Sequence, residues 1–233
     1  GRDGADAQRR SNLTGSGHAR SRSGGMFVKI CGLSQEQHVQ AAVESGADAV
    51  GFVFADSVRK VSPAEAVAIT IKVPGTIKKV AVMLHPSNDE WQEVLQGFGP
   101  DVLQTDAEDF AALAVPDHVE RWPVYREGNK VTDTFRPDTF RPGLEVPVTS
   151  FVYEGARSGQ GETVDWARAA EVAERGNMIL AGGLGVANVA EAIAIVRPYG
   201  VDVSSAVESA PGEKDSQKIR DFISAAKAAG NNL

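Results

Sequence analysis

A thiol and a carboxyl group each stand where an apolar run breaks into a turn. Cys31, the single cysteine of the chain, ends the run FVKIC, and Glu154 ends the run SFVYE. A thiol has an ordinary pKa of about 8.5, close enough to neutrality to serve as a base, and a carboxylic acid can donate a proton. A lone cysteine in an apolar strand is nevertheless more often a buried structural residue, and a carboxylate in a turn is often only solvated. Residue type alone therefore leaves both interpretations open.

Two later runs end in small or polar residues. The run MILAGG ends in Gly182 and Gly183, and the run GVDVSS carries Asp202, Ser204 and Ser205. A glycine amide can approach an anion closely because there is no Cβ, and serine adds a hydroxyl group. These turns are typical of a phosphate site, although a glycine pair also makes an ordinary tight turn.

Strand-like apolar runs alternate with helix-like stretches and must position these residues. We expect strands at 27–30, 47–54, 78–84, 101–105, 120–125, 148–154, 178–183 and 200–205. We expect helices at 33–46, 61–73, 87–97, 107–114, 164–176, 186–196 and about 215–229. Helix-end signals support several of them: Ser34 with Gln37 as a capping box, Ser62 as N-cap before Pro63, and Gly176 as a C-cap.

This alternation predicts an α/β fold, a single (β/α)8 TIM barrel with a closed parallel sheet and outer helices. A doubly wound open sheet of similar length is the alternative. The barrel is favoured because the polar residues named above lie at carboxyl ends of strands, which converge on one mouth only in a closed sheet. The stretch 126–143, with its repeated DTFRP, predicts a long loop or a broken helix.

Composition separates residues 1–25 from residues 26–233. The first segment is rich in Gly, Ser and Arg without apolar periodicity, so we expect a disordered leader or tag and a barrel domain after it. The barrel segment holds 19 basic against 29 acidic residues, a net charge of −10. An acidic body disfavours nucleic acid as a partner, and the absence of a long apolar run disfavours a membrane. One cysteine favours a reducing, cytoplasmic location.

Three stretches resemble one known family. KICGLSQEQHVQAAVESGADAVGFVFADSVRKVSPAEA resembles the start of phosphoribosylanthranilate isomerases of tryptophan biosynthesis, and ILAGGLGVANVAEAI and GVDVSSAVESAPGEKDSQKIRDF resemble their end. The resemblance runs from Met26 to about Phe222. It implies an intramolecular aldose–ketose isomerisation without a cofactor or a metal. N-(5-phosphoribosyl)anthranilate would undergo an Amadori rearrangement to 1-(2-carboxyphenylamino)-1-deoxyribulose 5-phosphate by general acid–base catalysis.

The resemblance also implies roles for individual residues. Cys31 matches the family's general base, and Glu154, aligned from Asp165 and Trp166, takes the place of its acidic aspartate. Arg59 matches the arginine that grips the anthranilate carboxylate, because a guanidinium fork suits a planar carboxylate. The other substrate-binding residues implied are Gln104 near the aromatic ring, Asp202 on a sugar hydroxyl, and Gly182, Gly183, Ser204 and Ser205 around the phosphate.

Four departures from the family pattern keep other functions open. They are Glu154 for aspartate, Ala206 for glycine, TDA after Gln104 where the family has Leu-His-Gly, and an altered glycine loop at 158–162 that we expect to be mobile. One alternative is a catalytically weakened phosphate-binding barrel. Another is a bifunctional isomerase that also serves histidine biosynthesis, although that class uses an aspartate at the position of Cys31. We expect a monomer, with a homodimer as the alternative, and a phosphorylated sugar as the small-molecule partner.

Overall fold

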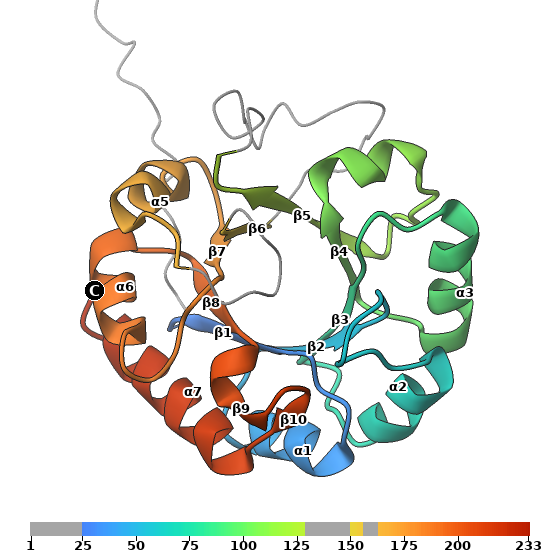
Figure 1. The fold of residues 1–233 in the computed structure, drawn as a ribbon, viewed down its shortest axis with the longest axis horizontal. Coiled ribbons are helices and arrows are strands. Elements are labelled where there is room, and N and C mark those ends of the chain that lie inside the picture. Colours follow the sequence, from blue (N-terminus) through green and yellow to red (C-terminus); the bar gives the residue numbers. More distant parts are fainter. Residues whose placement is uncertain (1–24, 129–149, 156–162) are drawn as a thin grey trace, which may run out of the picture.

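Eight parallel strands pair in chain order from β1 to β8, and β8 pairs with β1 to close the sheet. This computed structural model describes residues 25–128, 150–155 and 163–233. Figure 1 looks down the ring of strands, with the helices outside it. The expected barrel is confirmed and the open sheet is wrong. The strands are β1 Phe27–Cys31, β2 Ala49–Val53, β3 Lys78–Val82, β4 Val102–Asp106, β5 Glu120–Arg126, β6 Phe151–Glu154, β7 Met178–Leu180 and β8 Gly200–Val203.

The helices fall in the stretches with helical periodicity. The α-helices are α1 Glu36–Glu44, α2 Pro63–Thr70, α3 Asn88–Phe98, α5 Trp166–Ala173, α6 Val189–Val196 and α7 Ser216–Gly230. The weak pattern after β4 forms the 3-10 helix η1 Ala107–Ala112, and a second short one, η2 Ser205–Val207, follows β8. Most of the irregular stretch 126–143 lies outside the described residues.

Helix ends were predicted with mixed success. Ser62 caps α2 as expected: its hydroxyl accepts from Glu65 N, and the Glu65 side chain accepts from Ser62 N. Gln35, not Ser34, is the N-cap residue of α1, and it makes no capping bond with its side chain. Gly176 is not a C-cap, because α5 ends earlier, at Ala173, with Glu174 as its C-cap in right-handed backbone. A capping motif acts only if the helix begins or ends at the residue concerned. Tertiary packing helps to decide where that is.

The strands bury two distinct faces because successive side chains point to opposite sides of the sheet. One set packs against the helices and includes Ile30, Phe52 and Met178, all fully buried. The other set, which includes Val80 and Ile179, fills the barrel interior. Each fully buried side chain of this size contributes about 1.5–3 kcal/mol to stability. The interior is thus a packed core and leaves room for a site only at its ends.

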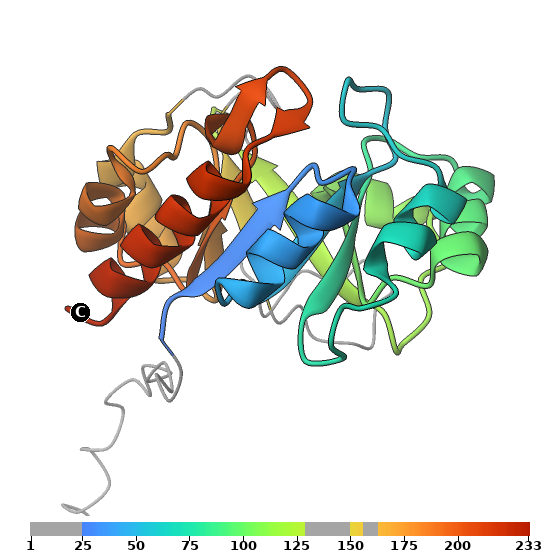
Figure 2. The ribbon, with the colours of Figure 1, turned by 90° about the horizontal axis from the view of Figure 1, so that it is seen from below.

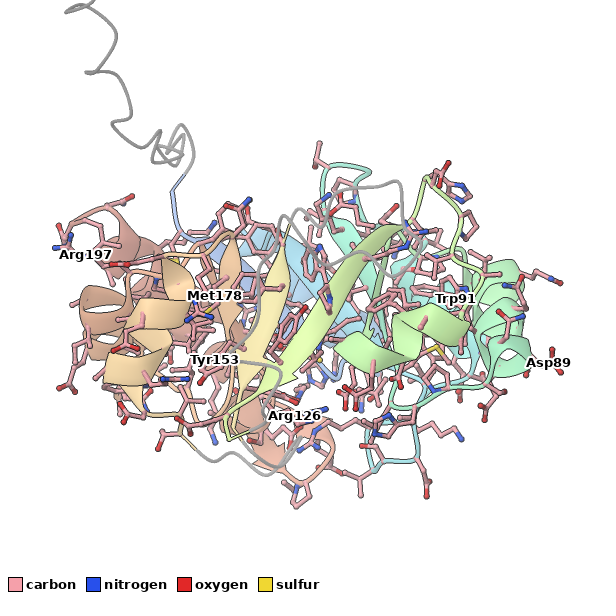
Figure 3. The ribbon with its side chains drawn as sticks, turned by 90° about the horizontal axis from the view of Figure 1, so that it is seen from above. Asp89, Trp91, Arg126, Tyr153, Met178 and Arg197 are labelled. Carbon is pink, nitrogen blue, oxygen red and sulfur yellow. The ribbon has the colours of Figure 1, made fainter. Side chains whose placement is uncertain are left out.

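The two ends of the barrel differ. In Figure 2 the β1 arrow points toward the end where a small antiparallel hairpin projects, formed by β9 Glu208–Ala210 and β10 Glu213–Lys214. Figure 3 places Arg126 at this carboxyl end, with Met178 nearer the other end. The hairpin was not predicted from the sequence. It lies directly after β8 and η2, so it belongs to the rim where the polar strand ends meet.

Candidate active site

A cavity of about 350 Å³ opens at the carboxyl ends of the strands. Residues from the ends of β1, β2, β3, β4, β6, β7 and β8 line it. Every site residue suggested by the sequence lies on this wall: Cys31, Arg59, Gln104, Glu154, Gly182, Gly183, Asp202, Ser204 and Ser205. The closed sheet therefore brings together residues that are up to 174 positions apart in the chain.

Cys31 is the last residue of β1 and is nearly buried, with 7% of its surface exposed. It pairs with Gly51 of β2, where a Cβ would lie 3.1 Å from Cys31 Sγ and 3.1 Å from Lys29 Nζ. The thiol and the ammonium group thus share the space left by a glycine. Because the thiol faces this polar site and not the helix layer, a purely structural role for Cys31 fits poorly.

Burial and charge act in opposite directions on this thiol. Burial raises the pKa of Cys31 above its ordinary value, and Lys29 and Lys214 lower that pKa less than burial raises it, while Asp202 raises it further. The nearby lysines thus limit the effect of burial on the Cys31 pKa without reversing it.

Lys29 and Asp202 form an ion pair inside the barrel. Lys29 Nζ lies 3.0 Å from Asp202 Oδ2, and the Lys29 side chain is completely buried. The other carboxylate oxygen, Asp202 Oδ1, is buried and has no hydrogen-bond partner among the described residues. Burial raises the pKa of Asp202 despite the opposing effect of Lys29. Asp202 lines the cavity, and its buried oxygen without a partner suits a ligand hydroxyl group.

Glu154 ends β6 and is held by Arg126 from the neighbouring strand. The sheet register places Arg126 beside Glu154, and Arg126 Nη1 donates a hydrogen bond to Glu154 Oε1. The other terminal nitrogen of the guanidinium group, Arg126 Nη2, donates to Asp106 Oδ1 at the end of β4. Tyr153, the residue before Glu154, is buried in the layer facing the helices. Of these two residues, only Glu154 reaches the cavity.

The turns after β7 and β8 place glycine amides and serine hydroxyl groups in the cavity wall. Gly182 and Gly183 both have positive φ angles, 91° and 63°, which favour glycine. Within the described chain, their amides donate to no protein acceptor. Ser204 and Ser205 flank them at the start of η2. Two free glycine amides and two hydroxyl groups suit a phosphate.

Comparison with known protein families gives a match over most of the chain. Residues 28–225 match the family model described as N-(5'phosphoribosyl)anthranilate (PRA) isomerase. The chain belongs to this family. A phosphoribosylanthranilate isomerase of Listeria innocua is 39% identical over 212 residues, covering 88% of this chain and all of the relative. One from Bordetella petrii is 37% identical over 225 residues, covering 88% and 97%.

Solved phosphoribosylanthranilate isomerases share the fold. A TrpF structure from Jonesia denitrificans is 31% identical, covers 88% of this chain and 98% of its own, and has a TM-score of 0.70. Another, in complex with reduced 1-(o-carboxyphenylamino)-1-deoxyribulose 5-phosphate, is 28% identical with a TM-score of 0.69, covering 87% and 99%. That complex shows a relative holding a phosphorylated product analogue.

Two departures from the phosphoribosylanthranilate isomerase pattern differ in their structural effect. Ala206 replaces a glycine but does not have a positive φ angle, so the alanine causes no backbone strain. Asp106 stands where the family has histidine, and it accepts from Arg126, which also holds Glu154. Glu154, which replaces the shorter aspartate, and Asp106 at the end of β4 therefore belong to one ion-pair cluster around Arg126. The altered loop at 158–162 lies outside the described residues.

Arg59 lies on the cavity wall after β2 and is already bound to a carboxylate. Its Nε and Nη2 atoms donate to Glu208 Oε1 and Oε2, at 2.6 Å and 2.9 Å. Lys214 Nζ also donates to Glu208 Oε1, at 2.6 Å. Neither Glu208 nor Lys214 was proposed from the sequence as a site residue. The only signal was the motif V-E-x-x-P-G-x-K-D, which marks the family without assigning a task to these charges.

The sequence also missed a histidine–carboxylate cluster at the strand-4 side of the mouth. His85 bonds Asp109 at 2.9 Å, and this bond raises the pKa of His85. Ligand atoms of His85, Asp106 and Glu108 lie within 4.8 Å of one another, whereas the family resemblance implied no metal site. Because Arg126 already donates to Asp106, a cation there would compete with a guanidinium.

Proposed function

We propose that this chain catalyses the Amadori rearrangement of N-(5-phosphoribosyl)anthranilate, with Cys31 as general base and Glu154 as general acid. One observation carries this proposal: a single cavity holds a thiol, a carboxyl group, an arginine and two anion-binding turns. The strands that carry the thiol and the acid, β1 and β6, are separated by β7 and β8 around the ring. A substrate lying across the mouth would meet both groups.

The reaction needs two proton transfers that these groups supply. Glu154, when protonated, gives its proton to the ring oxygen as the bond between C1 and that oxygen breaks, and the nitrogen lone pair forms the C1–N double bond. The Cys31 thiolate then takes the proton from C2, and the electron pair of that C–H bond forms the C1–C2 double bond. At the same time the π pair of the C1–N double bond returns to nitrogen, which leaves a C1–N single bond. The resulting enol-amine tautomerises to the ketose. Oxidation at C2 balances reduction at C1, so no cofactor is required.

The charged ends of the substrate suit the two sides of the cavity. The phosphate would be bound by the amides of Gly182 and Gly183 and by Ser204 and Ser205. The anthranilate carboxylate would pair with Arg59, with the Gln104 side chain beside the ring. Asp202 Oδ1, buried and without a partner in the described structure, would accept a ribose hydroxyl. A carboxylate beside the phosphate itself would be unfavourable, so Asp202 faces the sugar.

Turnover tests this function directly. Purified protein incubated with fresh phosphoribosylanthranilate should remove the fluorescence of that substrate. Cys31→Ala and Glu154→Gln should each slow the reaction by a factor of about a hundred or more, because each removes a proton-transfer group. An inactive parent chain would favour the weakened phosphate-binding barrel. Turnover of the histidine-pathway aminoaldose would favour the bifunctional isomerase.

We further propose a monomeric barrel, with residues 26–233 as its one domain, working in the reducing cytoplasm. A catalytic thiol must stay reduced, which supports that location. Structures of relatives include monomers of a dimeric Thermotoga maritima enzyme, so a homodimer is the alternative. No helix among the described residues is long and apolar enough to cross a membrane.

A further inference from the structure

Glu208 begins the β9–β10 hairpin and lies among three cations from different parts of the chain. Its carboxylate accepts from Arg59 in the β2–α2 loop and from Lys214 in β10. Its backbone oxygen accepts from Lys218 of α7 at 2.7 Å. The Glu208 side chain is only 5% exposed and does not line the cavity. Glu208 therefore touches substrate-binding residues without being placed to touch substrate.

The Arg59 contact leaves part of the guanidinium available. Glu208 takes the edge formed by Nε and Nη2. A guanidinium has five N–H donors, so the edge formed by Nη1 and Nη2 can still bind a second carboxylate. In the described structure, that edge carries no protein acceptor. Glu208 thus fixes the plane of the fork and the direction in which its open edge faces.

Lys214 extends the same network to the phosphate side. Its Nζ donates to Glu208 Oε1 at 2.6 Å, to Ser204 O at 2.9 Å and to Ser204 Oγ at 3.2 Å. The Lys214 side chain is completely buried. A buried ammonium group with three oxygen partners has its donors used and is costly to move. The position of Ser204 therefore depends on the carboxylate that also holds Arg59.

Glycines allow this close packing. Gly32 has a φ of 77°, and a Cβ there would lie 2.6 Å from Arg59 Cδ and 3.3 Å from Lys214 Nζ. Gly212, with a φ of 83°, donates to Glu208 Oε2 at 3.2 Å and brings the hairpin close to Val58 O. The ion pairs and hydrogen bonds lower the pKa of Glu208 to about 2, despite burial acting in the other direction. Its carboxylate is therefore ionised throughout the neutral range.

We propose that Glu208 is a positioning residue: it orients Arg59 toward the substrate carboxylate and, through Lys214, sets where Ser204 meets the phosphate. One carboxylate thereby sets the spacing between the two anion sites of the cavity. This inference rests on the proposed substrate, which carries a carboxylate at one end and a phosphate at the other. It gives the motif V-E-x-x-P-G-x-K-D a task beyond marking the family.

A double-mutant cycle with a stable probe tests this role. The variants are Glu208→Gln, Arg59→Met and the pair together, and the probe is reduced 1-(o-carboxyphenylamino)-1-deoxyribulose 5-phosphate, whose dissociation constant is measured by calorimetry. Glu208→Gln should weaken binding roughly tenfold in the parent chain, the value of a lost charge-assisted hydrogen bond. It should have little further effect when Arg59 is already methionine. Equal weakening in both backgrounds, or none in the parent, would overturn the proposal.

Two further arms remove ambiguity. Glu208→Asp keeps the charge beside Lys214 but draws the carboxylate back by one methylene, so it tests the same coupling if Glu208→Gln folds poorly. Inorganic phosphate should bind more weakly to Lys214→Met than to Arg59→Met, because Lys214 is the residue that holds Ser204. Equal affinities would contradict the proposal that Lys214 positions Ser204 for the phosphate. Turnover of phosphoribosylanthranilate by the parent chain is measured separately. A parent that binds the analogue but does not turn over substrate would contradict the proposed function, and the cycle would still decide the role of Glu208.

Discussion

Lys29 and Asp202 are register partners in the β1–β8 pair, and their side chains meet 3.0 Å apart inside the barrel, one layer below Cys31. The Lys29 side chain is completely buried and the Asp202 side chain is only 9% exposed, so little water can replace a lost partner. Two buried charges stabilise a fold only while they are together. The ion pair therefore contributes charge beside the Cys31 thiol and also fixes how β1 and β8 pack inside the barrel.

The first prediction concerns this pair. Lys29→Met should lower the free energy of unfolding by about 3–5 kcal/mol, because it leaves Asp202 as an unpaired buried charge. Lys29→Met combined with Asp202→Asn should recover much of that loss. Urea denaturation of the parent, the two single variants and the double variant measures this directly. Strictly additive losses would show that the two charges do not depend on each other.

The second prediction is a pH profile. Burial raises the pKa of Cys31, and a base must be deprotonated to act, so kcat/KM should rise with pH through the neutral range. Below the thiol pKa the rate should fall about tenfold for each pH unit. A stopped-flow series between about pH 6 and pH 9 checks the slope. A flat profile would mean that Cys31 does not set the rate.

The third prediction separates charge from length at the acid. Glu154→Gln removes the proton donor and should reduce kcat by a factor of about a hundred or more. Glu154→Asp keeps a carboxylic acid and restores the family residue, but it moves the carboxyl group away from Arg126. Because the proton donor is retained, kcat should stay within about tenfold of the parent value. Steady-state kinetics of the two variants tests this. Similar activity of both variants would remove Glu154 from the chemistry.

The fourth prediction uses a matched pair of glycines. Gly32→Ala would force a Cβ to within 2.6 Å of Arg59 Cδ at a positive φ angle, so it should raise KM and cost about 1–3 kcal/mol of stability. Gly75→Ala is the control, since nothing lies within 4 Å of its Cβ position and its φ is not positive. Equal effects of the two substitutions would contradict the importance of close packing around Arg59.

The fifth prediction is the acid limb of stability. The pKa of Glu208 is lowered from its ordinary value to about 2, so its ion pairs stabilise the fold above the unfolded pKa and are lost as pH falls toward 2. The difference in unfolding free energy between the parent and Glu208→Gln should therefore shrink when pH is lowered from about 5 to about 3. A constant difference would mean that the charge of Glu208 is not what stabilises the hairpin.

Sequence patterns predicted the barrel because each strand is an apolar run of its own. All eight strands and the α2 cap at Ser62 depend on residues close in the chain, which is where periodicity and capping carry information. The β9–β10 hairpin escaped detection because its strands have three and two residues, too few to show alternation.

The site was predicted where a residue ends a strand and missed where charges pair over long separations. Cys31 and the cavity glycines stand at strand ends, which converge in any closed barrel, and the resemblance to the isomerase family singled them out as site residues. The partnership of Arg59 with Glu208 spans 149 positions, and no local pattern links the two residues. Arg126 was missed because it stands at the start of an irregular stretch that hid the end of β5.

The structure of the chain bound to reduced 1-(o-carboxyphenylamino)-1-deoxyribulose 5-phosphate tests the central claim most directly. We predict that Cys31 Sγ lies about 3.5 Å from the carbon corresponding to C2, the separation of a group poised to react. The phosphate should contact the amides of Gly182 and Gly183, with the carboxylate on Arg59. A bound analogue whose C2 lies away from Cys31, or whose phosphate lies outside the β7 and β8 turns, would contradict the account.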